Sequence, residues 1–147
     1  MVFLENDSLR VSILPKGAEL QNIYNKQNRT EYLWNGDPAF WAKRSPVLFP
    51  IVGTLKNDTY FYEGKSYQLP RHGFARDKEF TVAGQSSTSA TFTLVSDDST
   101  LPVFPFAFRF DIMYTIERDT VTTTYRVTNT GDKDLYFSVG GHPAFKV

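Results

Sequence analysis

The residues of this sequence that are best suited to acid–base chemistry are two histidines next to glycines. His72 lies in residues 70–76 (PRHGFAR) and His142 in residues 140–145 (GGHPAF). An imidazole, with an unperturbed pKa of roughly 6.5, can give and take a proton near neutral pH. The adjacent glycines permit close backbone approach or unusual dihedral angles. Taken alone, His72 also fits a surface histidine beside a turn, and His142 also fits a structural residue at a strand end.

Three arginines near these motifs are candidates for ligand binding. Arg44 begins residues 44–50 (RSPVLFP), where two prolines hold the backbone extended. Arg71 and Arg76 bracket His72. A guanidinium offers a rigid fork of donors that suits hydroxyl pairs or a phosphate. Each of the three is equally compatible with a solvated side chain, so the arginines alone decide nothing.

The remaining composition argues against several kinds of site. The chain has no cysteine and only two histidines, so we expect no disulfide, no thiolate nucleophile and no metal site. The 16 Asp and Glu are scattered, and no pair is spaced for glycosidase-type acid–base work. They balance 16 Lys and Arg, and this neutral charge argues against a nucleic-acid partner. No glycine-rich loop leads into a helix that could hold a phosphate.

The sequence has no feature of a membrane or exported protein. Residues 1–7 (MVFLEND) lack the basic and apolar regions of a signal peptide. No run of about 18 apolar residues is present that could span a bilayer. We therefore expect a cytoplasmic protein with no membrane partner.

The dominant hydrophobic period is two, which predicts β-strands. The alternation is strongest over residues 106–116 and 121–127, and with residues 135–139 these segments predict a three-stranded meander. Asp37 and Pro38 predict a helix of one or two turns that ends at Lys43. Three earlier hairpins are predicted from residues 9–14 with 19–24, 60–62 with 66–69, and 79–83 with 91–95. The chain of 147 residues thus predicts a single all-β domain, an antiparallel β-sandwich or part of one.

Three segments, taken in order, resemble the aldose 1-epimerase (galactose mutarotase-like) family. They are residues 44–53 (RSPVLFPIVG), 71–76 (RHGFAR) and 140–145 (GGHPAF), and the bacterial galactose-mutarotase-related branch is the most similar. The resemblance covers the whole chain and implies a β-sandwich of the supersandwich type. Residues 1–147 would be the N-terminal part of this single domain, about half of it. The resemblance implies an isomerase that interconverts the α and β anomers of a hexose by acid–base ring opening, without a cofactor or metal.

The resemblance also assigns roles to individual residues. His142 matches the general acid that protonates the ring oxygen, and His72 matches the histidine that hydrogen-bonds the sugar near that oxygen. Arg44 matches a substrate-binding arginine. Arg76 matches basic residues that contact the 6-phosphate in the related glucose-6-phosphate 1-epimerases. The implied partner is a small-molecule sugar or sugar phosphate. The alternatives are a glucose-6-phosphate 1-epimerase-like activity and a non-catalytic sugar-binding module.

Family members are longer than this chain, and their general base is a glutamate in the second half. The resemblance therefore implies that this chain alone is inactive or nearly so, because losing one acid–base partner costs about 10²–10⁴ in rate. We also expect an uncovered apolar face on residues 106–116, which would favour dimerisation or association through that face. His142 is expected to lie in a segment that frays.

Overall fold

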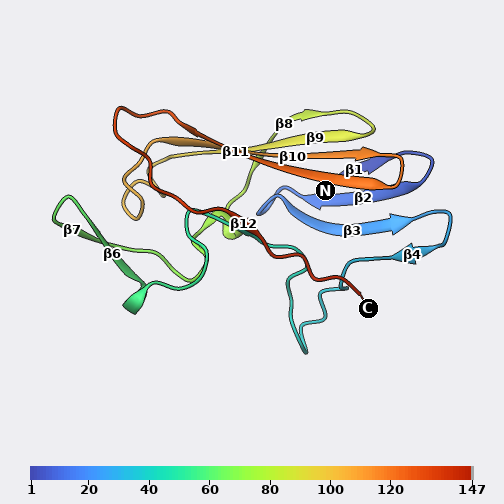
Figure 1. Cartoon of the computed structure of the whole chain (residues 1–147), viewed down its shortest axis with the longest axis horizontal. Helices are drawn as coiled ribbons and strands as arrows, with labels where there is room; N and C mark the ends of the chain where they lie inside the picture. The colour runs from blue at the N-terminus through green and yellow to red at the C-terminus, as the bar shows by residue number, and fades with distance from the viewer. Residues whose placement is uncertain (147) are drawn as a thin grey trace.

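The computed structural model describes residues 1–146, and its regular structure is almost all antiparallel strand (Figure 1). A first sheet has the order β1-β2-β3-β4 and a second has the order β11-β10-β9-β8. The first sheet consists of β1 (Val2–Glu5), β2 (Leu9–Leu14), β3 (Glu19–Asn25) and β4 (Thr30–Glu31). The second consists of β8 (Thr81–Gln85), β9 (Ser89–Val95), β10 (Phe108–Glu117) and β11 (Thr120–Asn129).

Two small strand pairs lie between and beside these sheets. The hairpin of β6 (Thr59–Tyr62) and β7 (Lys65–Gln68) projects from one end of the molecule (Figure 1). The other pair joins β5 (Val47–Leu48) to β12 (Gly140–Gly141) and so brings distant parts of the chain together. Two single 3₁₀ turns complete the regular structure, η1 (Lys56–Asp58) and η2 (Ala75–Asp77).

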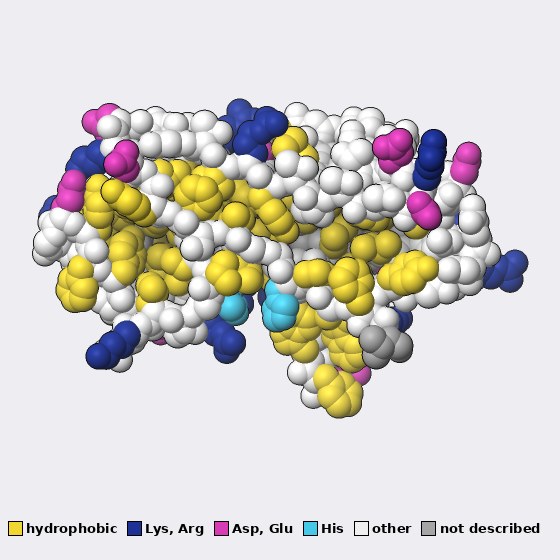
Figure 2. Space-filling view, in the orientation of Figure 1, with side chains coloured by type: hydrophobic (Ala, Val, Ile, Leu, Met, Phe, Trp, Pro, Cys, Tyr) yellow, Lys and Arg dark blue, Asp and Glu magenta, His cyan; other side chains and the backbone are white. Residues whose placement is uncertain are grey.

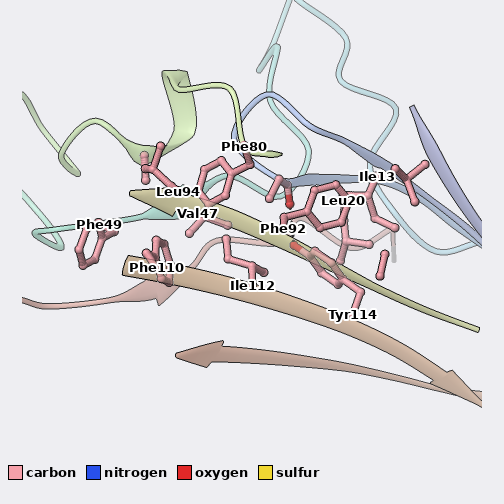
Figure 3. Packing of buried hydrophobic residues seen from close by; sticks show 14 of the residues in the cluster. Ile13, Leu20, Val47, Phe49, Phe80, Phe92, Leu94, Phe110, Ile112 and Tyr114 are labelled. Atoms are coloured by element: carbon pink, nitrogen blue, oxygen red, sulfur yellow. Dashed lines mark hydrogen bonds between the residues drawn. The ribbon is translucent and has the colours of Figure 1, made fainter. Parts of the chain in front are cut away.

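The core forms between the two large sheets because β9 and β10 each bury every second side chain. On β10 the buried face includes Phe110, Ile112 and Tyr114, and Figure 3 shows it against Ile13 and Leu20 of the first sheet. The Tyr114 hydroxyl, which is buried with its ring, donates to the Ala18 carbonyl at 2.7 Å. This bond satisfies the one polar atom of that side chain and joins β10 to the connection between β2 and β3.

Phe49 is the aromatic centre of the core at the end nearest β5. Its ring centroid lies 4.6 Å from that of Phe110 and 5.1 Å from that of Phe108. Phe74 and Phe104 contact the same ring edge-on, at 6.2 and 6.1 Å. Offset and edge-on pairs are the arrangements that aromatic rings favour. Residues between the sheets therefore cover the second sheet at this end.

This cover makes the expectation for residues 106–116 wrong. Their apolar side chains are the centre of the core, and Phe108, Phe110 and Ile112 are at most 1% exposed. The apolar residues of β11, from Val121 to Val127, are instead only half-buried. Hydrophobic side chains are visible across the face drawn in Figure 2.

The all-β antiparallel prediction is confirmed, and so are the three hairpins. The third strand of the meander is wrong, because residues 135–139 do not pair beside β11. Asn129 donates to the Lys133 carbonyl at 2.7 Å and closes a turn that leads the chain away from the sheet. The backbone N–H of Ser138 then donates to the Pro50 carbonyl at 2.8 Å, and strand pairing resumes at β12.

The short helix predicted after Asp37 is also wrong, although its capping residue acts as expected. The Asp37 side chain accepts from the Ala39 N–H at 2.9 Å, and its carbonyl accepts from the Trp41 N–H at 2.8 Å. Only this one turn forms, because contacts with the first sheet fix the backbone from Arg44 onward. Over residues 1–146, no helix is long and apolar enough to cross a membrane.

Candidate active site

The pairing of β5 with β12 positions His142. Gly141 lies opposite Val47, and the His142 N–H donates to the Pro46 carbonyl at 3.0 Å. The Ala144 N–H continues the ladder by donating to the Arg44 carbonyl at 2.9 Å. Backbone hydrogen bonds thus hold both sides of His142 in this structure, and the expected fraying stays a prediction. Further on, the backbone N–H of Lys146 donates to the Tyr32 carbonyl at 2.8 Å.

The two glycines before His142 allow neighbouring side chains to pack closely against the backbone. A Cβ on Gly141 would lie 2.6 Å from the Tyr125 hydroxyl, and one on Gly140 would lie 3.3 Å from Val52. Neither glycine has a positive φ. Of the two explanations left open by the sequence, close packing is therefore the one that applies.

A strained turn positions His72. The Gly73 N–H donates to the Pro70 carbonyl at 2.8 Å, and both His72 and Gly73 have positive φ, at 67° and 71°. A Cβ on Gly73 would lie 2.2 Å from the Phe49 carbonyl oxygen, which accepts bonds from the Phe74 and Ala75 N–H groups. Only glycine fits this contact, so Gly73 fixes the turn against the core.

The His72 imidazole is oriented by the backbone of Gly53. The Gly53 N–H donates to Nδ1 of His72 at 3.0 Å, and the His72 N–H donates to the Gly53 carbonyl at 2.8 Å. Because Nδ1 accepts, neutral His72 carries its proton on Nε2. Burial, followed by the charges of Arg71, Arg76 and His142, lowers the pKa of His72 from its ordinary value. His72 is therefore a neutral donor at physiological pH.

The two histidines lie in one pocket. Their ring centroids are 6.5 Å apart, and the His142 ring lies 5.1 Å from that of Trp41. The pocket has a volume of about 200 Å³. In Figure 2 the histidine side chains lie beside each other at the lower edge of the molecule. The lining residues are Trp41, Lys43, Pro46, Arg71, His72, Arg76 and His142.

The pocket is basic, and nearby carboxylates partly offset its charge. Arg76 lines it and donates from its guanidinium to the Arg71 carbonyl at 2.9 Å, while its role in binding a phosphate stays a prediction. Asp77 lies 3.6 Å from Arg76 and 3.8 Å from Lys43. Lys43 also lies 3.9 Å from Oε2 of Glu19, which is buried. Because Asp77 is exposed, its ion pairs are weak, and Arg76 remains available to an anionic group.

Arg44 is the predicted residue that does not line this pocket. Its guanidinium packs on Gly36 and donates to the Gln21 carbonyl at 2.6 Å. Its backbone, by contrast, supports the pocket through the bond that it accepts from Ala144. A substrate-binding role for Arg44 stays a prediction.

Sequence reasoning missed Trp41, Lys43 and Glu19. Trp41 and Lys43 lie within the three residues before Arg44, and this closeness in sequence to the Arg44 motif is the only signal that could have identified them. Glu19 is 6% exposed, and its carboxylate accepts from the N–H groups of Arg44 and Ser45 at 2.8 and 3.0 Å. Nothing in its sequence context distinguishes it from a solvated strand residue.

Comparison with known proteins identifies relatives of this chain. The aldose 1-epimerase family model matches residues 1–147. The LacX protein of Lactococcus lactis is 34% identical over 97% of this chain and 49% of its own length. A galactose mutarotase related enzyme from Lactobacillus acidophilus is 40% identical with a TM-score of 0.98, over 99% of this chain and 49% of that one. A galactose mutarotase-like protein from Lactobacillus casei is 39% identical with a TM-score of 0.97, over 100% and 50%. The chain spans about half the length of these relatives. It belongs to the aldose 1-epimerase family.

Proposed function

We propose that this chain supplies the acid side of an aldose 1-epimerase site. His142 protonates the ring oxygen of an aldohexose, and His72 hydrogen-bonds the sugar near that oxygen. The observation that carries the proposal is the meeting of both imidazoles in one pocket, 6.5 Å apart. The Nε2–H of His72, left free by the bond from Gly53 to Nδ1, suits a donor to a sugar oxygen.

The proposed reaction needs only proton transfers. His142 gives a proton to the ring oxygen while a base removes one from the anomeric hydroxyl, so the C1–O5 bond breaks and a C1 carbonyl forms. Rotation about C1–C2 exposes the other face of that carbonyl. On closure the ring oxygen attacks the carbonyl carbon and returns its proton to His142, while the base returns its proton to the carbonyl oxygen, which regenerates the hemiacetal. No metal or cofactor takes part in these steps.

We assign no general base to residues 1–146. The residues that line the pocket include three cations, two histidines, Trp41 and Pro46, but no carboxylate. The nearby carboxylate of Glu19 does not line the pocket: its Oε1 accepts from the N–H groups of Arg44 and Ser45, and its Oε2 lies 3.9 Å from Nζ of Lys43. We propose that the base comes from polypeptide corresponding to the second half of the longer relatives.

The experiment compares the 147-residue chain with a fusion of this chain to the second half of the Lactobacillus acidophilus relative. Exchange between the α and β anomers of galactose and glucose is followed by NMR. We expect little acceleration by the chain alone, and acceleration by the fusion that His142→Ala lowers by at least about 10². Strong His142-dependent exchange by the chain alone would refute the missing base.

The same experiment tests the rival function, a sugar-binding module without catalysis. A folded fusion that binds hexose, does not exchange anomers and is indifferent to His142→Ala would favour that module. It would also overturn the proposed role of His142.

A sugar phosphate is a second candidate substrate, because Lys43, Arg71 and Arg76 line the same pocket as the histidines. A guanidinium can bind a phosphate through two parallel hydrogen bonds. For a phosphorylated substrate, Arg76→Gln in the fusion should lower kcat/KM for glucose 6-phosphate and leave that for glucose unchanged. Equal effects on both sugars would favour a neutral hexose.

We propose that the rest of the sandwich packs on the half-buried face of β11. Support comes from a groove of about 280 Å³ whose lining includes Tyr125, Ile23 and Phe145. Phe145 is 59% exposed, which is unusual for a ring beside an apolar groove. Light scattering tests this proposal: the chain alone should self-associate, whereas the fusion should be monomeric. A monomeric chain that binds no apolar dye would count against it.

A further inference from the structure

A second hollow lies on the outer face of the first sheet, and none of its lining residues belongs to the histidine pocket. Cross-strand pairing builds it. Phe3, Ser12 and Asn22 form one row across β1, β2 and β3. Arg10, Tyr24 and Glu31 form the next row across β2, β3 and β4. The hollow has a volume of about 290 Å³.

A directed hydrogen-bond network forms one part of this hollow. The Ser12 hydroxyl donates to Oδ1 of Asn22 at 2.6 Å, and Nδ2 of Asn22 donates to Oε2 of Glu31 at 3.0 Å. The other carboxylate oxygen of Glu31 accepts from the N–H groups of Ile23 and Leu33 at 2.9 and 3.0 Å. These backbone bonds fix the carboxylate, which accepts only and therefore fixes the orientation of the Asn22 amide and of the Ser12 hydroxyl.

The network leaves polar capacity at fixed positions. Asn22 has a second N–H, and the Ser12 oxygen and Oε2 of Glu31 each keep an unused lone pair in the network. Ser12 is 3% exposed although it lies on the outer face, so neighbouring side chains surround it. The partly exposed Asn22 and Glu31 therefore hold a donor and an acceptor at the surface, and the buried Ser12 fixes the Asn22 amide.

Aromatic rings supply the other part of the hollow. Phe3 is 56% exposed, and the Arg10 guanidinium lies over the Tyr24 ring, 5.2 Å from its centroid. This contact holds the ring in place. The positive charge of Arg10 and the negative charge of Glu31 balance, so the hollow favours neither an anion nor a cation.

We propose that this hollow binds a neutral saccharide. Each sugar hydroxyl both donates and accepts, which matches the free N–H of Asn22 and the free lone pair of Glu31, while the apolar C–H face of a pyranose suits the exposed ring of Phe3. A site of this kind combines a few fixed polar groups with an apolar wall. The proposal concerns a ligand site separate from the histidine pocket and does not depend on the proposed epimerase activity.

Titration of the ¹⁵N-labelled 147-residue chain with lactose and cellobiose, followed by backbone NMR, tests the proposal. We expect saturable shifts on β1 to β4 around Ser12 and Asn22, and the same shifts in a His142→Ala variant. Phe3→Ala and Asn22→Ala should each weaken binding by about tenfold. Phe61→Ala is the matched control, because Phe61 is an exposed ring on β6, 78% accessible, and this variant should bind as the parent does.

Three results of the titrations with neutral sugars would overturn the proposal. They are the absence of saturable shifts on β1 to β4, shifts confined to the histidine pocket, and saturable shifts that Phe3→Ala and Asn22→Ala leave unchanged. Glucose 6-phosphate provides the anionic comparison. Tighter binding of this anion than of the neutral sugars at the hollow would also contradict the proposal, because it would assign the site to Arg10 alone.

Discussion

The Nδ1 atom of His72 accepts a hydrogen bond from the Gly53 backbone at 3.0 Å, and this bond determines the protonation chemistry of the pocket. Protonating Nδ1 would break the bond and place a third positive charge beside those of Arg71 and Arg76. Burial acts in the same direction, and together these effects lower the pKa of His72. One histidine of the pair is thus kept neutral, which agrees with our proposal that His72 donates a hydrogen bond to the sugar.

We expect folding stability to rise with pH as His72 becomes neutral. The pKa of His72 is lowered in the folded state, so the unfolded chain binds the proton first as the pH falls. The contribution is complete above the unfolded pKa of roughly 6.5 and is lost as the pH falls through the lower folded pKa. NMR titration of the imidazole should give this lowered pKa and the Nε2–H tautomer. A proton on Nδ1 or a raised pKa would refute the assignment.

His72→Asn is the matched variant. Asparagine can place an oxygen where Nδ1 lies, and it tolerates the positive φ of 67° at this position. Stability at pH 8 should therefore change little, while the pH dependence due to residue 72 disappears. Urea unfolding at pH 8 and pH 5 measures both quantities.

The carboxylate of Glu19 should contribute strongly to stability. It accepts from the Arg44 and Ser45 N–H groups at 2.8 and 3.0 Å, and Glu19→Ala leaves both without this partner. We expect a loss of about 2–3 kcal/mol in the free energy of unfolding, measured in urea. Glu19→Gln keeps one acceptor oxygen and should lose less. Glu117→Ala, an exposed residue at the end of β10, should stay within about 0.5 kcal/mol of the parent.

How far the sequence predicts this molecule depends on the range of the interactions. The alternation over β10 and the turn residues of the β6–β7 hairpin are local signals, and both elements form as predicted. The strand predicted over residues 135–139 is wrong. The chain after Asn129 pairs only at β12, and its partner β5 is distant in sequence. Alternation predicts that a strand has an apolar face but not what covers it. The length of the family's sandwich predicts an uncovered face on residues 106–116, but distant parts of the same chain, such as Phe49, bury it.

In the candidate site, too, local motifs are predictable from the sequence and contacts between distant segments are not. His72, His142 and Arg76 are brought together as their motifs indicate. Trp41 could not be found, because its contact with His142 depends on the β5–β12 pairing. Arg44 illustrates the opposite case: its motif is present, but its guanidinium binds the backbone of β3.

Gly73→Ala should destabilise the fold far more than a substitution at another positive-φ glycine. A Cβ at Gly73 would lie 2.2 Å from the Phe49 carbonyl oxygen, whereas a Cβ at Gly64, where φ is +76°, meets nothing within 4 Å. Gly64→Ala should therefore cost only the left-handed strain, about 1–2 kcal/mol. Gly73→Ala should cost more than about 4 kcal/mol or prevent folding. Equal losses in thermal unfolding would contradict the close contact at Gly73.

Trp41→Ala should release the His142 side chain without unfolding the chain. The two rings lie 5.1 Å apart, and the Trp41 backbone is held independently of its side chain through the Asp37 carbonyl. In NMR spectra the His142 ring protons should lose the ring-current shift that the indole causes, while the His72 ring protons keep their chemical shifts. Phe40→Ala is the control, because this neighbouring ring is 82% exposed and does not contact His142 among the described ring pairs. Unchanged His142 signals in Trp41→Ala would show that β5 and β12 alone orient the imidazole, and Trp41 would then have no positioning role.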